Sequence, residues 1–232
     1  MALLEVKGLS YDYPDGTPAL LDLSLSLEEG DKIALVGANG SGKSTLLLHM
    51  AGCFAPQRGE ISLRGKPVGK DLRALKDSVG MVFQEPDDQL FMPSVALDVS
   101  FGLAARKVRP EEAASAASRC LERLGIARLA DRPPHRLSSG EKRLVAIAGV
   151  LVTDPEIIAL DEPTAALDPR ARREVMKILG GLDKSMIIAT HDLDMARTLC
   201  RRAVVICSGR VAAEGPAGDL LADEKALETY GL

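Results

Sequence analysis

Aromatic side chains are scarce in this chain. Only 3% of the 232 residues are aromatic, none is Trp, and the net charge is −4 at pH 7. A nucleic-acid partner is therefore not expected, because it would call for a basic surface or aromatic stacking platforms. The cysteines form no CxxC pair, so we expect buried, reduced thiols rather than disulfides or a zinc site. They are Cys53, Cys120, Cys200 and Cys207.

Long apolar runs are also missing. A membrane-spanning helix needs about 20 predominantly apolar residues, and no stretch approaches that length. Glu5 and Lys7 stand where a signal peptide would be apolar. The sequence therefore predicts a soluble, cytoplasmic protein that reaches a membrane only through partners.

The pattern of apolar residues predicts an α/β fold. Residues 3–36 alternate apolar and polar side chains, which is typical of antiparallel strands. Residues 85–152 have a helical pattern, and short apolar runs alternate with helical segments after them. We expect one domain over residues 1–232, with a mainly parallel sheet and an N-terminal antiparallel β subdomain in residues 1–84 and 153–232. An α-helical subdomain is inserted at about 85–152.

A glycine-rich stretch follows the apolar run Lys32–Val36. Gly37-Ala-Asn-Gly-Ser-Gly-Lys43-Ser44 fits GxxxxGK[ST], the phosphate-binding loop of P-loop NTPases. Its backbone N–H groups and the following helix favour phosphate, Lys43 neutralises β/γ oxygens, and Ser44 coordinates Mg²⁺. The alternative is a merely flexible turn. The expected nucleotide-binding residues are Gly37, Asn39, Gly40, Ser41, Gly42, Lys43, Ser44 and Thr45.

Two acidic residues follow a second apolar run. Asp161 and Glu162 come directly after Ile157–Leu160. Ligands of doubly wound sheets bind beyond the carboxyl ends of strands, so Asp161 is expected to hold Mg²⁺ and Glu162 to polarise the water that attacks ATP. A solvated turn is the alternative for such a pair alone. Together with the phosphate loop, the pair predicts a nucleotide-hydrolase core.

Further motifs occur in an order that resembles the ATPase subunits of ABC transporters. The stretch 137–141, LSSGE, resembles the LSGGQ signature, and 166–168, ALD, resembles the D-loop. The resemblance implies the ABC ATPase fold, bound ATP and Mg²⁺, and roles for residues beyond the phosphate loop. These are Gln84 (Q-loop, catalytic and metal-binding), His191 (catalytic switch), Tyr13 (adenine stacking) and Ser138, Ser139, Gly140, Glu141 and Asp168 (nucleotide binding).

The signature implies a homodimer. Ser138 and Gly140 begin a helix whose anion site points away from its own phosphate loop, so it serves the ATP of a second copy in a head-to-tail sandwich. An ordinary Ser-capped helix is the alternative. Ser139 replaces the usual first Gly and Glu141 the usual Gln. These departures either weaken binding to the second copy's ATP or leave it intact.

The remaining aromatic and histidine residues receive simpler interpretations. Tyr11 shares a strand face with Tyr13, so either ring is a candidate for the adenine. Phe54, Phe101 and Tyr230 are expected to serve packing. His49 and His135 are expected to be structural.

The stretch 84–91, QEPDDQLF, narrows the transporter type. It resembles energy-coupling-factor importers, especially their cobalt and nickel members. Asp87 and Asp88 are then expected to accept arginine contacts from a membrane partner, with Phe83, Phe91 and Met92 as apolar anchors. The resemblance implies an integral membrane coupling subunit, a substrate-binding membrane subunit and a peripheral position at the cytoplasmic face of the membrane. Some energy-coupling ATPases carry a longer C-terminal dimerisation extension than the stretch after Leu220 can hold. In this respect the chain resembles the simpler systems that use one ATPase as a homodimer.

Three functions stay open at this point. The first is the ATPase of a cobalt or nickel importer, and the second is the ATPase of a vitamin importer, such as one for biotin, or of another ABC importer. The third is a non-transport ABC ATPase of DNA repair, chromosome organisation or translation. Such ATPases of repair and chromosome organisation usually carry a long coiled-coil or zinc-binding insertion, for which this chain has neither the length nor the cysteines.

Overall fold

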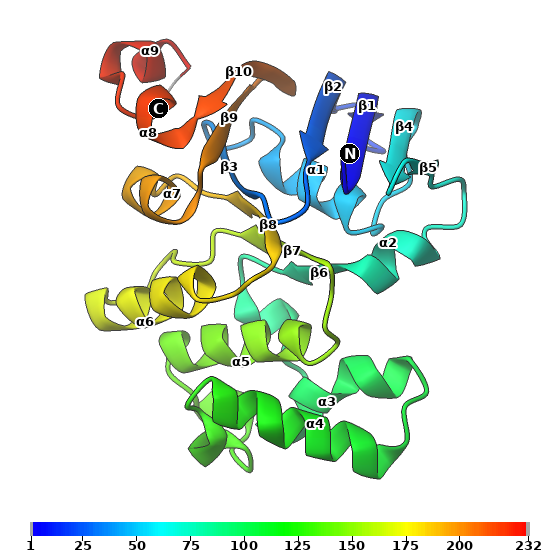
Figure 1. Cartoon of the computed structure of the whole chain (residues 1–232), viewed down its shortest axis with the longest axis vertical. Helices are drawn as coiled ribbons and strands as arrows, with labels where there is room; N and C mark the ends of the chain where they lie inside the picture. Colours follow the sequence, from blue (N-terminus) through cyan, green and yellow to red (C-terminus); the bar gives the residue numbers. More distant parts are fainter. Residues whose placement is uncertain (1, 231–232) are drawn as a thin grey trace. The chain divides into compact units, whose positions relative to one another are not determined.

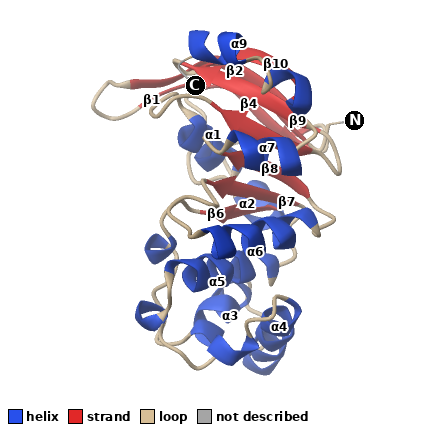
Figure 2. Cartoon of the chain, turned by 90° about the vertical axis from the view of Figure 1, so that its left-hand side faces the viewer, coloured by secondary structure: helices blue, strands red, loops and turns tan. Residues whose placement is uncertain are grey.

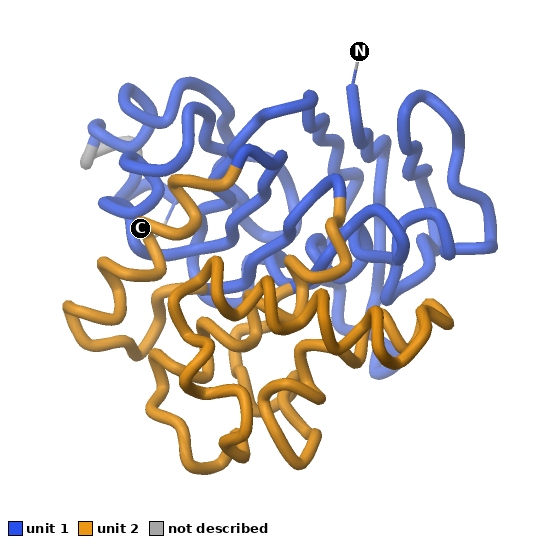
Figure 3. Tube along the Cα trace, turned by 60° about the horizontal axis from the view of Figure 1, so that its bottom comes forward, with its two compact units in different colours: residues 1–81, 156–162, 183–232 blue, residues 82–155, 163–182 orange. Residues whose placement is uncertain are grey.

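The computed structural model describes residues 2–230, without the side chains of residues 224–226. Two compact units are present (Figure 3): unit 1 comprises residues 1–81, 156–162 and 183–232, and unit 2 comprises residues 82–155 and 163–182. Unit 1 holds the two sheets, whereas unit 2 is built from helices (Figure 2). Within the described part, no helix has the length and apolar character needed to cross a bilayer.

A four-stranded antiparallel sheet forms the N-terminal part of unit 1. Its order is β2-β1-β4-β5. Pro18 opens the edge strand β2, a position where its missing N–H costs no ladder hydrogen bond. This sheet confirms the predicted antiparallel β subdomain. The strands are β1 (Leu4–Asp12), β2 (Pro18–Leu27), β4 (Arg58–Leu63) and β5 (Lys66–Pro67).

The second sheet has six strands in the order β10-β9-β3-β8-β7-β6 (Figure 1). β3 pairs in parallel with β8 and β9, β7 pairs in parallel with β8, and β10 pairs antiparallel with β9. Every residue of β7 and β8 is buried, as expected for parallel strands covered on both faces. The predicted mainly parallel sheet is confirmed. The strands are β3 (Lys32–Val36), β6 (Val79–Val82), β7 (Ile157–Asp161), β8 (Ser185–Ala189), β9 (Arg202–Cys207) and β10 (Arg210–Pro216).

Helix α1 (Lys43–Met50) packs between the two sheets of unit 1 (Figure 1). Leu46, Leu47 and Met50 are fully buried and belong to one hydrophobic cluster with side chains of both sheets. Burial of this helix therefore holds the segment after the phosphate loop in a fixed place. The other helices of unit 1 are α2 (Arg73–Ser78), α7 (Leu193–Leu199), α8 (Ala217–Leu220) and α9 (Glu224–Thr229).

Four α-helices build unit 2. α3 contacts both α4 and α5, and α5 also contacts α6. Pro110 in the first turn of α4, followed by Glu111 and Glu112, confirms the predicted helix start. The helices are α3 (Val95–Ala105), α4 (Pro110–Arg123), α5 (Ser139–Leu151) and α6 (Pro169–Gly180), with short 3₁₀ turns at Pro86–Asp88, Ala127–Leu129 and Pro134–Arg136.

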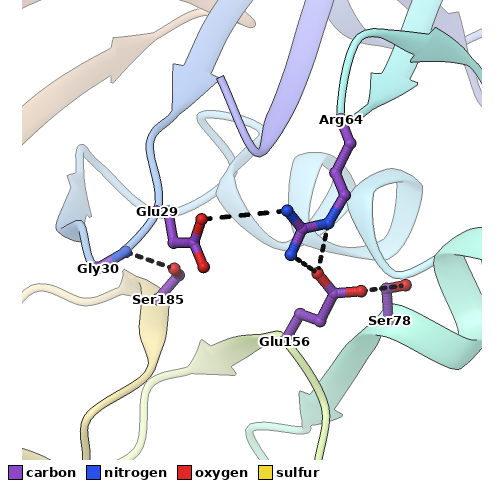
Figure 4. A network of polar contacts seen from close by, with 6 residues as sticks. All are labelled: Glu29, Gly30, Arg64, Ser78, Glu156 and Ser185. Carbon is purple, nitrogen blue, oxygen red and sulfur yellow. Dashed lines mark hydrogen bonds and ion pairs between the residues drawn. The ribbon is translucent and has the colours of Figure 1, made fainter. Parts of the chain in front are cut away.

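A polar network lies at the amino ends of the parallel strands of unit 1 (Figure 4). Arg64, which follows β4, donates to Glu156, which precedes β7, and Ser78 at the end of α2 donates to the same carboxylate. The N–H of Gly30 donates to Ser185 Oγ at 2.9 Å. These contacts tie the antiparallel sheet and its loops to the edge of the parallel sheet where no nucleotide-binding residue is predicted.

The cysteines are only partly buried, which corrects one expectation. All four are free thiols, but Cys53 is exposed and Cys120 and Cys207 are half-buried. Cys53 lies in the turn after α1 rather than on its packed face. Cys200 is buried, and this burial raises the pKa of its thiol to about 12.

Candidate functional site

Three adjacent parallel strands bring the predicted catalytic residues of unit 1 to one edge. Leu35 of β3 and Asp161 of β7 both stand opposite Ala189 of β8. The phosphate loop begins two residues after Leu35, and His191 follows Ala189 by two residues. Because the carboxyl ends of parallel strands meet at one edge, the phosphate loop, the acidic pair and the histidine converge there.

The phosphate loop requires glycine at its first position. A Cβ on Gly37 would lie 2.1 Å from the carbonyl oxygen of Ile206 and 2.8 Å from Ser41 Oγ. The hydroxyl of Ser41 is itself buried and has no hydrogen-bond partner among the described residues. Buried polar groups are nearly always satisfied, so this hydroxyl is available to a ligand in the loop.

Lys43 is buried at the start of α1. Its ammonium donates to the carbonyl oxygens of Gly37 at 2.8 Å and Ala38 at 3.0 Å. Burial lowers the pKa of Lys43, while the charges of Glu162 and Asp161 act in the opposite direction. The ammonium is therefore within electrostatic range of both carboxylates.

Glu162 is held in an unusual backbone conformation. Its φ is +46°, a region that residues other than glycine rarely adopt. Its N–H donates to the carbonyl oxygen of Ala189, and its carboxylate accepts from Thr190 Oγ1 at 3.3 Å. Nδ1 of His191 lies 2.9 Å from the other carboxylate oxygen. β8 and the residues after it thus orient Glu162 on both carboxylate oxygens.

The predicted site residues divide between the two units. Unit 1 contains Tyr13, residues 37–45, Asp161, Glu162 and His191, whereas unit 2 contains Gln84, residues 138–141 and Asp168. Asp161 is buried, and Ser44 and Asn39 are exposed. Gln84 is exposed and its carbonyl oxygen accepts from Arg143. Within unit 1 the structure therefore brings together the loop lysine, the acidic pair and the histidine.

The two tyrosines near the phosphate loop have different surroundings. Tyr11 stacks on Phe54 with 5.4 Å between ring centroids, and its edge meets His49 at 4.7 Å. Among the described rings, Tyr13 makes only edge contacts, and its hydroxyl bonds Thr45 Oγ1 at 2.8 Å. One face of the Tyr11 ring is thus already covered, which favours Tyr13 as the adenine candidate. His49 is fully buried and bonds the carbonyl oxygen of Thr45, as expected of a structural residue, while His135 is exposed.

The signature segment of unit 2 forms the amino end of α5. Ser138 and Glu141 make a reciprocal capping box, in which each side chain bonds the other residue's N–H. Ser139 is the first helical residue, and its backbone is not left-handed. Serine in place of glycine at this position therefore causes no backbone strain. Gly140 is more constrained, because a Cβ there would lie 2.6 Å from the Cβ of Ala171 in α6.

Asp168 caps the amino end of α6. Its carboxylate accepts from the N–H groups of Ala171 at 3.0 Å and Arg170 at 2.8 Å. These backbone hydrogen bonds, that of Ala171 first, lower the pKa of Asp168. The preceding Ala166 has a φ of +57°. The D-loop segment is thus held in unit 2 by the hydrogen bonds that Asp168 accepts from the first turn of α6.

Three side chains tether residues 83–89 to α5. The guanidinium of Arg143 donates to the carbonyl oxygens of Phe83 at 2.7 Å and Gln84 at 2.6 Å. Gln89 bonds the N–H of Phe83 and the carbonyl oxygen of Ala146. The ammonium of Lys142 donates to both carboxylate oxygens of Asp87. Asp87 therefore already has a cation within its own chain, which the sequence did not indicate.

An exposed apolar patch lies in unit 2, next to these residues in the sequence. Phe91, Leu97 and Phe101 are 61%, 45% and 44% exposed, and the two phenylalanine rings meet edge to face at 4.9 Å. The exposure of Phe101 corrects its assignment to packing, since its side of α3 is not covered within unit 2. The buried carboxylate of Asp98 accepts from the N–H groups of Phe91 and Met92 and holds the segment in place. Burial raises the pKa of Asp98.

Sequence reasoning missed several residues that position the site. Thr190 holds Glu162, and Arg143 and Asp98 hold residues 83–92, although the sequence pattern assigns none of the three a role. One signal is available: Asp98 interrupts the apolar run Val-Ala-Leu-Asp-Val, whereas Arg143 follows the charged residues Glu141 and Lys142 and does not stand out. Charged residues are almost never fully buried unless paired, so such interruptions predict specific contacts.

The phosphate loop and the acidic pair at the carboxyl edge of a parallel sheet define a P-loop ATP hydrolase. The sequence model of the ABC transporter family matches residues 20–165, more than half of the chain. The chain therefore belongs to the ABC transporter family, as its ATP-hydrolysing subunit of the energy-coupling-factor type.

Individual relatives agree with this assignment. A Geobacter sulfurreducens protein, named as an ABC transporter ATP-binding protein, is 48% identical over 99% of this chain and 93% of its own length. The energy-coupling factor transporter ATP-binding protein EcfA of Methanocaldococcus jannaschii is 39% identical over 100% of this chain and 85% of its own. The structure of CbiO1 from Clostridium perfringens, part of the ABC transporter complex CbiONQ, matches with a TM-score of 0.85 and 40% identity, covering 98% of this chain and 94% of that one.

The packing of Gly140 against Ala171 leads to a stability prediction. Gly140→Ala should reduce the free energy of unfolding by about 1–3 kcal/mol, because the two Cβ atoms cannot both fit without a shift of the helices. Urea denaturation of the purified protein measures this. Ala171→Gly should cost less, and the double variant should lose less than the sum of the single losses. Strict additivity would contradict the contact.

Proposed function

We propose that unit 1 binds MgATP with its phosphate loop and hydrolyses it. The fit rests on the buried hydroxyl of Ser41, which has no partner among the described residues, and on the buried ammonium of Lys43, which the loop carbonyls of Gly37 and Ala38 hold in place. Backbone N–H groups of the loop and Lys43 hold the β- and γ-phosphates. Ser44 and Asp161 hold Mg²⁺, directly or through water. When bound, this ion neutralises charge that develops on the phosphates.

In this proposal Glu162 polarises the attacking water. Its carboxylate is fixed by Thr190 and His191, so its orientation is set before ATP binds. His191 is largely exposed and can turn toward the γ-phosphate. Tyr13 stacks on the adenine.

We propose that two copies form a head-to-tail ATP sandwich. Ser138, Ser139, Gly140 and Glu141 then meet the γ-phosphate bound by the other copy, and Asp168 lies in the same interface. The capping box engages the N–H groups of Ser138 and Glu141 and so fixes the first turn of α5, from which the N–H groups of Ser139 and Gly140 can meet a phosphate. In this scheme residues 85–152 serve as the signature subdomain of a single ATPase domain.

The role of Glu162 can be tested directly. Glu162→Gln should retain ATP binding, lower turnover by about 10²–10⁴-fold, and accumulate an ATP-bound dimer, because the amide cannot take up a proton from water. Steady-state ATPase assays and light scattering after size-exclusion chromatography measure these effects.

A matched control exists at the other end of the same strand. Glu156→Gln changes a glutamate that precedes β7 and bonds Arg64 and Ser78. It should leave turnover unchanged and should not make an ATP-bound dimer accumulate. Unchanged hydrolysis in Glu162→Gln would remove Glu162 from the mechanism.

We further propose that the apolar patch of Phe91, Leu97 and Phe101 docks an integral membrane coupling subunit. Exposed apolar patches rimmed by polar residues mark interaction sites, and buried Asp98 keeps the backbone of this patch rigid. Asp88 stays available for an arginine of the partner, whereas Asp87 is held by Lys142. The chain then lies peripherally on the cytoplasmic face of the membrane.

Replacing the two rings tests this docking site. Phe91→Ala with Phe101→Ala should lower ATP-driven uptake by about tenfold or more, because aromatic anchors dominate interface energies, while ATPase activity of the isolated subunit is retained. Uptake into membrane vesicles and co-purification with the membrane subunits measure the loss. Glu111→Ala on the neighbouring helix serves as the control. Full uptake in the double variant would place docking elsewhere.

The solute that we propose is a cobalt or nickel ion. The proposal rests on the likeness of residues 84–91 to cobalt and nickel members of the energy-coupling-factor group and on the similarity to CbiO1. A separate substrate-binding membrane subunit then selects the solute, because the ATPase does not touch it.

Affinity purification from native membranes tests this assignment. The ATPase should bring down a coupling subunit and a substrate-binding subunit, and the reconstituted complex should take up Co²⁺ or Ni²⁺ in the presence of ATP. Biotin uptake by the same complex would instead identify a vitamin importer. Recovery of no membrane subunit would favour a non-transport ATPase.

A further inference from the structure

Glu141 introduces a negative charge into the signature, and one arginine lies against it. Oε1 of Glu141 accepts from Nη1 of Arg128 at 2.8 Å. Oε2 accepts from the N–H of Ser138 at 3.1 Å and from its hydroxyl at 3.3 Å. Both oxygens of the carboxylate are thus engaged in unit 2. The hydrogen bond from Arg128 is the main cause of the lowered pKa of Glu141.

Arg128 owes its place to the short 3₁₀ turn before the signature. Ile126 and Leu129 on either side are buried, and the N–H of Leu129 donates to the carbonyl oxygen of Ile126. The Arg128 side chain between them is 62% exposed, while that of Glu141 is 20% exposed. The guanidinium of Arg128 therefore lies on the solvent side of Glu141, while the buried neighbours Ile126 and Leu129 fix the backbone of Arg128 in the core of unit 2.

The charged residues around Glu141 explain why the positive charge of Arg128 matters. Arg128, Ser138 and Glu141 line a cavity of about 270 Å³ together with Asp168, Arg170 and Glu174. Two guanidinium groups thus face three carboxylates. Removal of Arg128 leaves one cation against three anions at the place where the proposed dimer presents a triphosphate.

We propose that Arg128 is a positioning residue for ATP-driven dimerisation: it neutralises Glu141 and keeps that carboxylate folded onto Ser138, so that the signature offers its N–H groups to the second copy's γ-phosphate. This inference rests on the proposed head-to-tail dimer. It explains how a signature ending in Glu instead of Gln retains its function. Arg128 acts through Glu141 and need not touch the nucleotide.

The effect of Arg128 on the affinity of the ATP-bound dimer is measured in the Glu162→Gln variant, in which that dimer is expected to accumulate. Arg128→Ala should weaken the affinity of the ATP-bound dimer by about tenfold. The dimer contains two equivalent sites, and a loss of about threefold at each site multiplies to about tenfold for the dimer. In the presence of Glu141→Gln the same replacement should change the dimer affinity by less than about twofold. Arg128→Lys should restore most of the affinity because it keeps the charge. Analytical ultracentrifugation over a range of ATP concentrations gives the affinities.

Two further measurements separate positioning from folding. Without the Glu162→Gln change, Arg128→Ala should raise the KM for ATP more than it lowers kcat, and its thermal unfolding should match that of the parent. Arg132→Ala is the matched control, since this exposed arginine lies in the same segment and its side chain makes no ion pair among the described residues.

The outcomes distinguish the two proposals. A parent that stays monomeric with ATP overturns the head-to-tail dimer and, with it, the role of Arg128. A dimerising parent whose affinity is insensitive to Arg128→Ala overturns the positioning role alone. An equal loss with and without Glu141→Gln also overturns it, because Arg128 would then act independently of Glu141.

Discussion

The parallel pairing of β8 with both β3 and β7 is the constraint on which the catalytic edge depends. It places Leu35, Ala189 and Asp161 on one line across three buried strands. A shift of one residue in either pairing would turn the following side chains to the other face of the sheet. The N–H of Glu162 bonds the carbonyl oxygen of Ala189, so the same register also fixes the left-handed backbone of the proposed catalytic glutamate.

Helix α5 has a comparable importance within unit 2. Its first turn carries the signature, and the next residues hold the segment 83–89 through Arg143, Lys142 and the carbonyl oxygen of Ala146. If α5 moves as a rigid helix, any displacement of its first turn also displaces the residues of α5 that hold segment 83–89. In the proposed transporter, closure of the signature on ATP therefore reaches residues 83–89 without any intermediate element. The apolar patch begins two residues later at Phe91.

The sequence predicted those parts whose pattern follows from local chemistry. The phosphate loop and the fully buried strands were found because glycine spacing and continuous apolar runs reflect local requirements. Contacts between distant residues leave no such pattern, and so the pairing of Arg128 with Glu141 and the tether from Arg143 could not be predicted. β10 was also missed, since its alternating exposed residues lack the apolar face that marks a strand. Phe101 was misjudged because an aromatic residue on a helix is read as buried unless the fold shows an uncovered side.

Charge is handled differently in the two units, and this difference bears on the proposed cycle. In unit 1 the charge of a buried ammonium is felt by two buried carboxylates, and MgATP complements these groups with both a cation and phosphates. In unit 2 the carboxylate of the signature is already matched by Arg128, so the proposed contact to the phosphate relies on the N–H dipoles at the start of α5. Dipoles at a helix start contribute less than full charges and act over a shorter range. In the proposed dimer, loss of the γ-phosphate would therefore release unit 2 of one copy while unit 1 of the other still holds ADP, which gives the closed state a reason to open after hydrolysis.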